Sequence, residues 1–78
     1  MKESDTQTSR PPYRYELRGK IISEGHSSLA QFAHNIGISA SLMYRIVNGW
    51  WYPSPELQQR FANALGLRLK ELKKLLED

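Results

Sequence analysis

The chain has 78 residues, no cysteine and two histidines, so a disulfide framework is excluded and a structural zinc site lacks ligands. Its length suits one domain that is held together by packing alone. The net charge of +3 is compatible with nucleic-acid binding but too small to identify it. The sequence has neither the apolar run of a signal peptide nor one that spans a bilayer, so we expect a cytoplasmic protein with no membrane partner.

The N-terminal residues, 1–12, are polar, show no apolar period and end in a Pro-Pro pair. This composition predicts a flexible tail. The alternative is an arm that reaches DNA, for which Lys2 and Arg10 are the support. Residues 13–78 are expected to form the folded domain.

The first helix is predicted over residues 13–24, with Leu17 and Ile21 facing inward and Gly25 ending it in a left-handed conformation. Three basic side chains are placed on its outer surface: Arg14, Arg18 and Lys20. We expect them to be solvated, and the alternative is that they contact phosphates.

Two further short helices are predicted between residues 27 and 48, broken at Gly37. The first begins at an N-cap, Ser27 or Ser28. Its apolar residues repeat at i, i+3, i+4 and i+7, which gives one inward stripe: Leu29, Phe32, Ala33 and Ile36. The spacing across the break is that of a helix-turn-helix, a motif that lays one exposed helix face into a DNA groove.

The second of these helices, residues 39–48, separates its side chains by type at about 100° per residue. Its large aliphatic residues fall on one side: Leu42, Met43, Ile46 and Val47. The other side carries small or hydrogen-bonding residues and no carboxylate: Ala40, Ser41, Tyr44, Arg45 and Asn48. A solvated surface helix usually carries Glu and Lys instead.

The residues of this polar side have DNA-binding interpretations, and some of them have alternatives. Ala40 and Ser41 are small enough for close approach to base edges. Arg45 can make a bidentate contact with guanine or contact a phosphate. Tyr44 can contact sugar, thymine methyl or phosphate, or be a half-buried aromatic residue, and Asn48 before Gly49 fits a phosphate contact or a helix cap.

Residues 50–52 are Trp-Trp-Tyr. Three such side chains in a loop cannot all point inward, and exposed tryptophan suggests an interface. We expect one ring to cap the core and another to contact DNA or a protein partner.

The last two helices have clear start signals. Ser54 as N-cap, Pro55 at the first helical position and Glu56 in the first turn begin one, and Gly66 ends it. Its inward residues are predicted to be Leu57, Phe61, Ala64 and Leu65. In the final helix, residues 68–77, Leu69 and Leu72 are expected in the core, while Leu75 and Leu76 are candidates for a dimer interface.

The complete pattern resembles the helix-turn-helix superfamily of phage Cro and repressor proteins, the lambda-repressor-like or XRE-type domain. The resemblance covers about residues 17–76 and rests on these positions: Phe32, Ala33, Ile36, Gly37, Ile38, Met43, Ile46, Asn48, Gly49, Pro53 and the run from Leu57 to Leu67. It implies an all-α, compact bundle of four or five short helices, and the predicted elements here number five. It also implies dimeric binding to operator DNA with the third helix in the major groove.

Carried over residue by residue, the resemblance gives two sets of contacts. Bases are read by Ala40, Ser41, Tyr44 and Arg45. The DNA backbone is contacted by Ser28, Ser39, Asn48, Trp50, Trp51 and Tyr52. The chain departs from the family pattern at Leu29, where many members have a phosphate-anchoring glutamine, and at residues 50–52, where many have basic residues.

The charge distribution bears on affinity. Residues 1–28 and residues 55–78 each carry five basic and four acidic side chains, whereas residues 29–54 carry Arg45 alone. Because phosphate attraction scales with the number of Lys and Arg contacts, we expect one copy to bind weakly and a homodimer to form on double-stranded DNA.

The sequence therefore predicts a sequence-specific transcriptional regulator of phage or bacterial type, a repressor that places residues 39–48 in the major groove of an operator. The alternative is a protein-interaction module on the same fold, such as the antitoxin of a toxin–antitoxin pair, whose exposed tryptophans grip a protein. An enzyme is not expected, because no nucleophile, base and orienting group form a motif, and no cofactor-binding or metal-binding motif is present.

Overall fold

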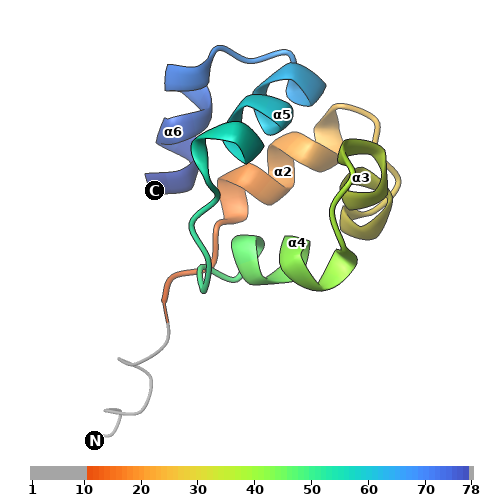
Figure 1. Cartoon of the computed structure of the whole chain (residues 1–78), viewed down its shortest axis with the longest axis horizontal. Coiled ribbons are helices and arrows are strands. Elements are labelled where there is room, and N and C mark those ends of the chain that lie inside the picture. Colours follow the sequence, from red (N-terminus) through yellow and green to blue (C-terminus); the bar gives the residue numbers. More distant parts are fainter. Residues whose placement is uncertain (1–10, 78) are drawn as a thin grey trace, which may run out of the picture.

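The computed structural model describes residues 11–77, which form five helices and no strand. In chain order the helices are α2 (Tyr15–Ser23), α3 (Leu29–Ile36), α4 (Ala40–Val47), α5 (Pro55–Leu65) and α6 (Leu69–Glu77). Figure 1 shows them around a shared interior, with α4 along one edge and the α5–α6 connection at the opposite edge. The predicted all-α class with five helices is confirmed. None of the helices in the described range is long and apolar enough to cross a membrane.

Serine side chains begin three of the helices. The Oγ atoms of Ser28, Ser39 and Ser54 accept hydrogen bonds from the amide three residues on, at 3.1, 3.1 and 3.3 Å respectively. Each bond satisfies a first-turn amide that has no acceptor within its own helix. Gly37 and Gly66 end α3 and α5 as predicted, and both adopt the left-handed conformation, with φ of 82° and 68°.

The core is built from apolar side chains of all five helices. The largest are completely buried: Leu17, Ile21, Phe32, Met43, Ile46, Phe61 and Leu72. Phe32 and Phe61 join α3 to α5 edge to face, with ring centroids 5.5 Å apart. This geometry places the positive edge of one ring against the negative face of the other. Helices α3 and α4 pack against each other, and both also pack against α2.

The buried side of α5 differs from the prediction. Ala64 is exposed and Ala62 is buried. Gln58, one turn before Ala62, is also buried because its Nε2 donates to the carbonyl oxygen of Pro53 at 2.8 Å. A polar residue that satisfies its hydrogen bond internally can thus belong to the core side. Leu57, Phe61 and Leu65 are buried as predicted, and the buried side extends to Gln58 and Ala62 instead of Ala64.

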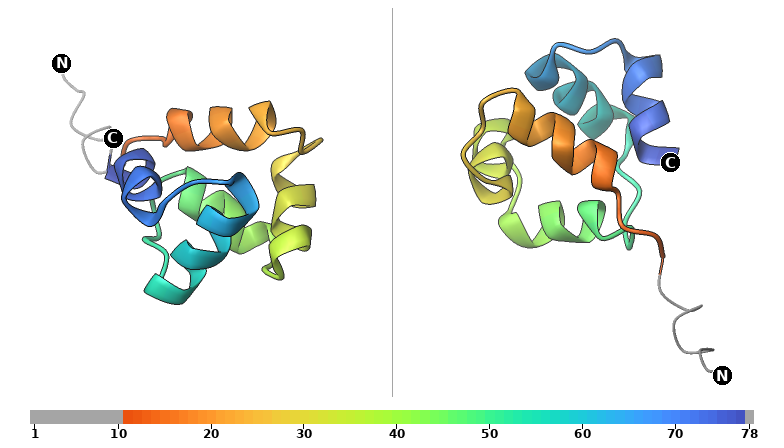
Figure 2. Two further views of the ribbon diagram at one scale, coloured as in Figure 1. Left: turned by 90° about the horizontal axis from the view of Figure 1, so that it is seen from above. Right: turned by 180° about the vertical axis from the view of Figure 1, so that it is seen from behind.

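Helix α6 also corrects a prediction. Leu76 is buried, with 3% of its surface exposed, so its side chain is not available for the dimer contact that we expected. Leu69, predicted to be buried, is half-buried, as is the other dimer candidate, Leu75, and both pack against the core. The reason is the position of α6, which packs against both α2 and α5 (Figures 1 and 2).

Candidate nucleic-acid interface

Helix α4 has one buried and one exposed side, as predicted. Met43, Ile46 and Val47 are completely buried, and Leu42 is half-buried. The exposed side, here called the α4 face, consists of Ala40, Ser41, Tyr44, Arg45 and Asn48. Tyr44 retains 46% of its surface exposed, so it is not a core residue. The α4 face therefore has no packing role that explains its residues.

The α4 face can donate hydrogen bonds and carries no negatively charged side chain. No carboxylate occurs in residues 29–54. The ion pairs in the described residues join Lys20 to Glu24 and Arg60 to Glu56, both within single helices. The guanidinium of Arg45 is exposed and takes part in no ion pair within residues 11–77. It remains available to a ligand.

The N-termini of α3 and α4 expose further main-chain donors, and that of α4 adjoins the α4 face. Ser28 and Ser39, the two serines that we predicted to contact the DNA backbone, are exposed and act as N-caps. Each cap uses its hydroxyl to satisfy one amide, and the first amides of each helix still lack an intrahelical acceptor. Such amides favour anionic groups.

The C-terminal end of α4 is held by Arg14, which the sequence had placed on a solvated surface. Its Nη1 donates to the carbonyl oxygens of Ile46 at 2.6 Å and Trp51 at 3.0 Å, and its Nε donates to that of Leu76 at 2.8 Å. Burial lowers the pKa of Arg14, an effect opposed by its interaction with Tyr52. Arginine nevertheless stays charged, so a cation lies at the negative ends of α4 and α6.

The segment before α2 lies across the same end of α4. The amide of Arg14 donates to the carbonyl oxygen of Val47 at 2.7 Å. A Cβ atom on Gly49 would lie 2.5 Å from the carbonyl oxygen of Pro12 and 3.1 Å from Pro11. Pro11 and Pro12, which we had assigned to the tail, thus pack closely on the chain after α4. Residues 1–10 of that tail lie outside the described residues.

The aromatic residues 50–52 all remain exposed, which corrects the expectation that one ring caps the core. Trp50, Trp51 and Tyr52 are 59%, 49% and 49% exposed. The following residue, Pro53, is completely buried and fills the core position. The Tyr52 ring centroid lies 5.7 Å from Cζ of Arg14, within cation–π range.

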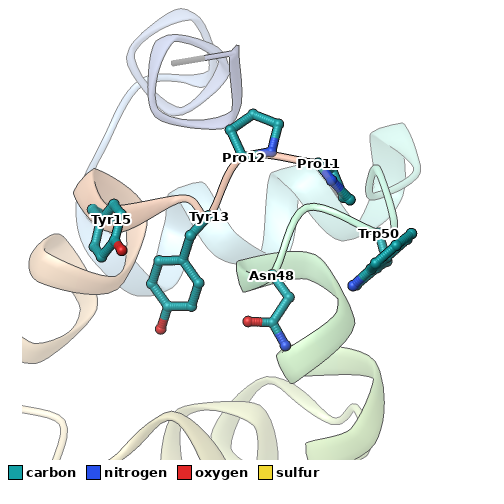
Figure 3. Close-up of a pocket in the computed structure, with 6 residues that line it drawn as sticks. All are labelled: Pro11, Pro12, Tyr13, Tyr15, Asn48 and Trp50. Carbon is teal, nitrogen blue, oxygen red and sulfur yellow. The ribbon is translucent and has the colours of Figure 1, made fainter. Parts of the chain in front are cut away.

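A pocket of about 590 Å³ lies between the segment before α2 and the end of α4. Figure 3 shows the six residues that line it, which we call the end pocket: Pro11, Pro12, Tyr13, Tyr15, Asn48 and Trp50. The rings of Tyr13 and Tyr15 lie 4.5 Å apart, centroid to centroid. We did not predict Tyr13 or Tyr15 as site residues, because their place in the pocket depends on how the segment before α2 packs on the end of α4.

The other described titratable side chains include one histidine that packs against the core. His26 packs edge to face against Phe32, with ring centroids 4.7 Å apart. Within residues 11–77, no group of three or more His, Cys, Asp or Glu side chains is placed to hold a metal ion. The α4 face and the end pocket present exposed hydrogen-bond donors and aromatic rings, which can contact a ligand.

No protein-family model, curated protein or solved structure matches this chain.

Proposed function

We propose that the chain is a sequence-specific DNA-binding transcriptional repressor in which α3 and α4 form a lambda-repressor-like helix-turn-helix. The observation that carries this proposal is the α4 face, which is exposed and free of carboxylates and whose opposite side is buried in the core. Helix α4 lies at the edge of the molecule (Figure 1), and a major groove accepts one α-helix. In this proposal α4 is the helix that enters the groove, and α3 packs against it and supports it.

The proposal assigns base contacts to the first part of the α4 face. Ala40 and Ser41 have small side chains in the first turn, so the helix can approach base edges closely. Tyr44 and Arg45 lie one turn later on the same side. Arg45 is the side chain suited to guanine, whose O6 and N7 atoms accept a bidentate pair of hydrogen bonds.

The DNA backbone contacts lie around the two ends of the helix pair. Ser28 and Ser39 mark the exposed N-termini of α3 and α4, where main-chain amides can donate to phosphates. Asn48, Trp50, Trp51 and Tyr52 supply donors at the other end, and all four are exposed.

Selection from random duplex DNA tests the proposal. We expect an enriched motif of two related half-sites, since a dimer reads both. Arg45→Ala should relax the preference at one base pair, with a loss of about 1–3 kcal/mol in discrimination. Asn48→Ala should weaken binding evenly across sequences.

The matched control for Arg45 is Arg68→Ala. Arg68 is exposed and lies in the α5–α6 connection, at the opposite edge from α4 (Figure 1). Its contact with Glu71 is made by the main-chain amide, which alanine retains. No enrichment of any duplex, or equal profiles for the Arg45 and Asn48 variants, would contradict the assigned roles.

Exposed Trp50 and Trp51 favour a second candidate, a protein-interaction module such as an antitoxin. Tryptophan is enriched in the energetically important centres of protein interfaces. This function predicts recovery of a toxin-like protein that is lost in a Trp50→Ala, Trp51→Ala variant, together with no enriched DNA motif.

A further inference from the structure

The end pocket adjoins the α4 face, because Asn48 belongs to both. Asn48 follows the last residue of α4 and lies three positions after Arg45, on the same side of the helix. Figure 3 shows its side chain directed into the space beside Tyr13. A duplex that lies along α4 and continues past its C-terminal end therefore meets the end pocket.

A helix C-terminus normally repels phosphate, since its free carbonyl groups carry about half a negative charge. Here the last four carbonyl oxygens of α4 are all satisfied. Those of Tyr44, Arg45 and Ile46 accept from the amides of Asn48, Trp50 and Gly49. The Val47 oxygen accepts from the Arg14 amide, and Ile46 also accepts from the Arg14 guanidinium. The cation removes the electrostatic obstacle to an anion at this end.

The lining chemistry suits a sugar–phosphate group. None of the six lining residues carries a formal charge, and four of them bring hydrogen-bond donors: the two phenols, the Asn48 amide and the Trp50 indole. Tyr15 is 75% exposed and Trp50 is 59% exposed, so their donors reach solvent. The rings and prolines offer apolar surface for the sugar.

The end pocket is also held in place before any ligand arrives. The close packing of Gly49 on Pro12 and the hydrogen bond from Arg14 to Val47 join its two walls. A pocket whose walls are fixed loses little conformational entropy on binding.

We infer that the end pocket binds the sugar–phosphate backbone of the duplex whose major groove receives α4, with Tyr15, Asn48 and Trp50 as neutral donors. This inference rests on the proposed function. It adds Tyr13 and Tyr15 to the interface and extends the contact from the α4 face onto the segment before α2.

The test combines protein variants with DNA in which single phosphates are replaced by uncharged methylphosphonates. The full chain is titrated with its selected duplex and with each modified duplex. We expect one replacement beside the half-site to weaken wild-type binding about tenfold, the loss of one hydrogen bond to a charged group. In the Asn48→Ala and Tyr15→Phe variants the same replacement should weaken binding by a clearly smaller factor than in the wild type, because the donor to that phosphate is already absent.

Two measurements sharpen this result. The dependence of affinity on salt should be unchanged in both variants, because neutral donors release no counterions. Asn63→Ala is the matched control for Asn48→Ala, because Asn63 is exposed near the end of α5. It should retain wild-type affinity and the full methylphosphonate effect.

The outcomes separate this inference from the proposed function. Suppose that the wild-type chain selects a duplex but that every methylphosphonate lowers the affinity of the variants by the same factor as that of the wild type. The end pocket is then not a DNA contact. Its aromatic side chains are then free for a protein partner. If the wild-type chain selects no duplex, both proposals fail.

Discussion

Arg14 joins three segments that lie far apart in the chain, and its contacts predict a large effect on stability. Its guanidinium donates to main-chain oxygens of Ile46, Trp51 and Leu76. Arg14→Met removes these hydrogen bonds and the charge at the ends of α4 and α6. We expect it to lower the free energy of unfolding by about 2–3 kcal/mol, measured by urea denaturation with tryptophan fluorescence.

The Arg14→Lys variant distinguishes the effect of the positive charge from that of the hydrogen-bond geometry of the guanidinium. Lysine keeps a cation near both helix ends but lacks the planar fork that reaches several oxygens at once. We expect it to recover a minor part of the lost stability. Full recovery would mean that the charge alone matters, and a Met variant as stable as the wild type would contradict the importance of the contacts.

The role of Arg14 could not be predicted from the sequence. Its acceptors are main-chain oxygens 32, 37 and 62 positions away, and a carbonyl group leaves no signature in the residue type. The separation of α4 residues into buried and exposed sides was predictable, because it depends on helical periodicity alone.

At the scale of elements, the docking of the segment before α2 onto the end of α4 depends on Gly49. This residue has φ of 88°, and an added Cβ would approach the Pro12 oxygen to 2.5 Å. Gly49→Ala should therefore cost the left-handed strain plus a displacement of the proline segment, at least about 2 kcal/mol in total. Thermal and urea unfolding measure this loss.

Gly25→Ala is the matched control. Gly25 has φ of 97°, and nothing lies within 4 Å of an added Cβ. This variant should show the backbone strain alone, about 1 kcal/mol. Equal losses in the two variants would show that the proline segment yields without cost.

Helix ends could be predicted where the signal is local, and burial could not where it depends on packing partners. Ser54 and Gly66 bound α5 as expected because caps act within a few residues. Leu76 was misassigned because its burial depends on where α6 lies against α2 and α5. The prediction that one aromatic ring of residues 50–52 caps the core was wrong, because Pro53 fills that position.

At the scale of the whole molecule, none of the exposed large apolar side chains of residues 11–77 comes from α6. Five of them belong to the start of α2, to α4 or to the chain that follows α4: Tyr15, Tyr44, Trp50, Trp51 and Tyr52. The sixth, Ile22, lies near the end of α2. Helix α6 directs Leu72 and Leu76 into the core and keeps Leu75 half-buried. It therefore offers no broad apolar side of the kind that stable homodimers bury.

We accordingly expect the free chain to sediment as a 9.0 kDa monomer at high micromolar concentration, with Leu75→Ala unchanged in mass. A stable dimer without DNA that Leu75→Ala dissociates would contradict this and restore the α6 interface. On a duplex with two half-sites, two copies should bind, and a single half-site should be bound weakly. The physical reason is that residues 29–54 carry one cation, so each copy gains little from counterion release, and affinity must come from joining two sites on one duplex.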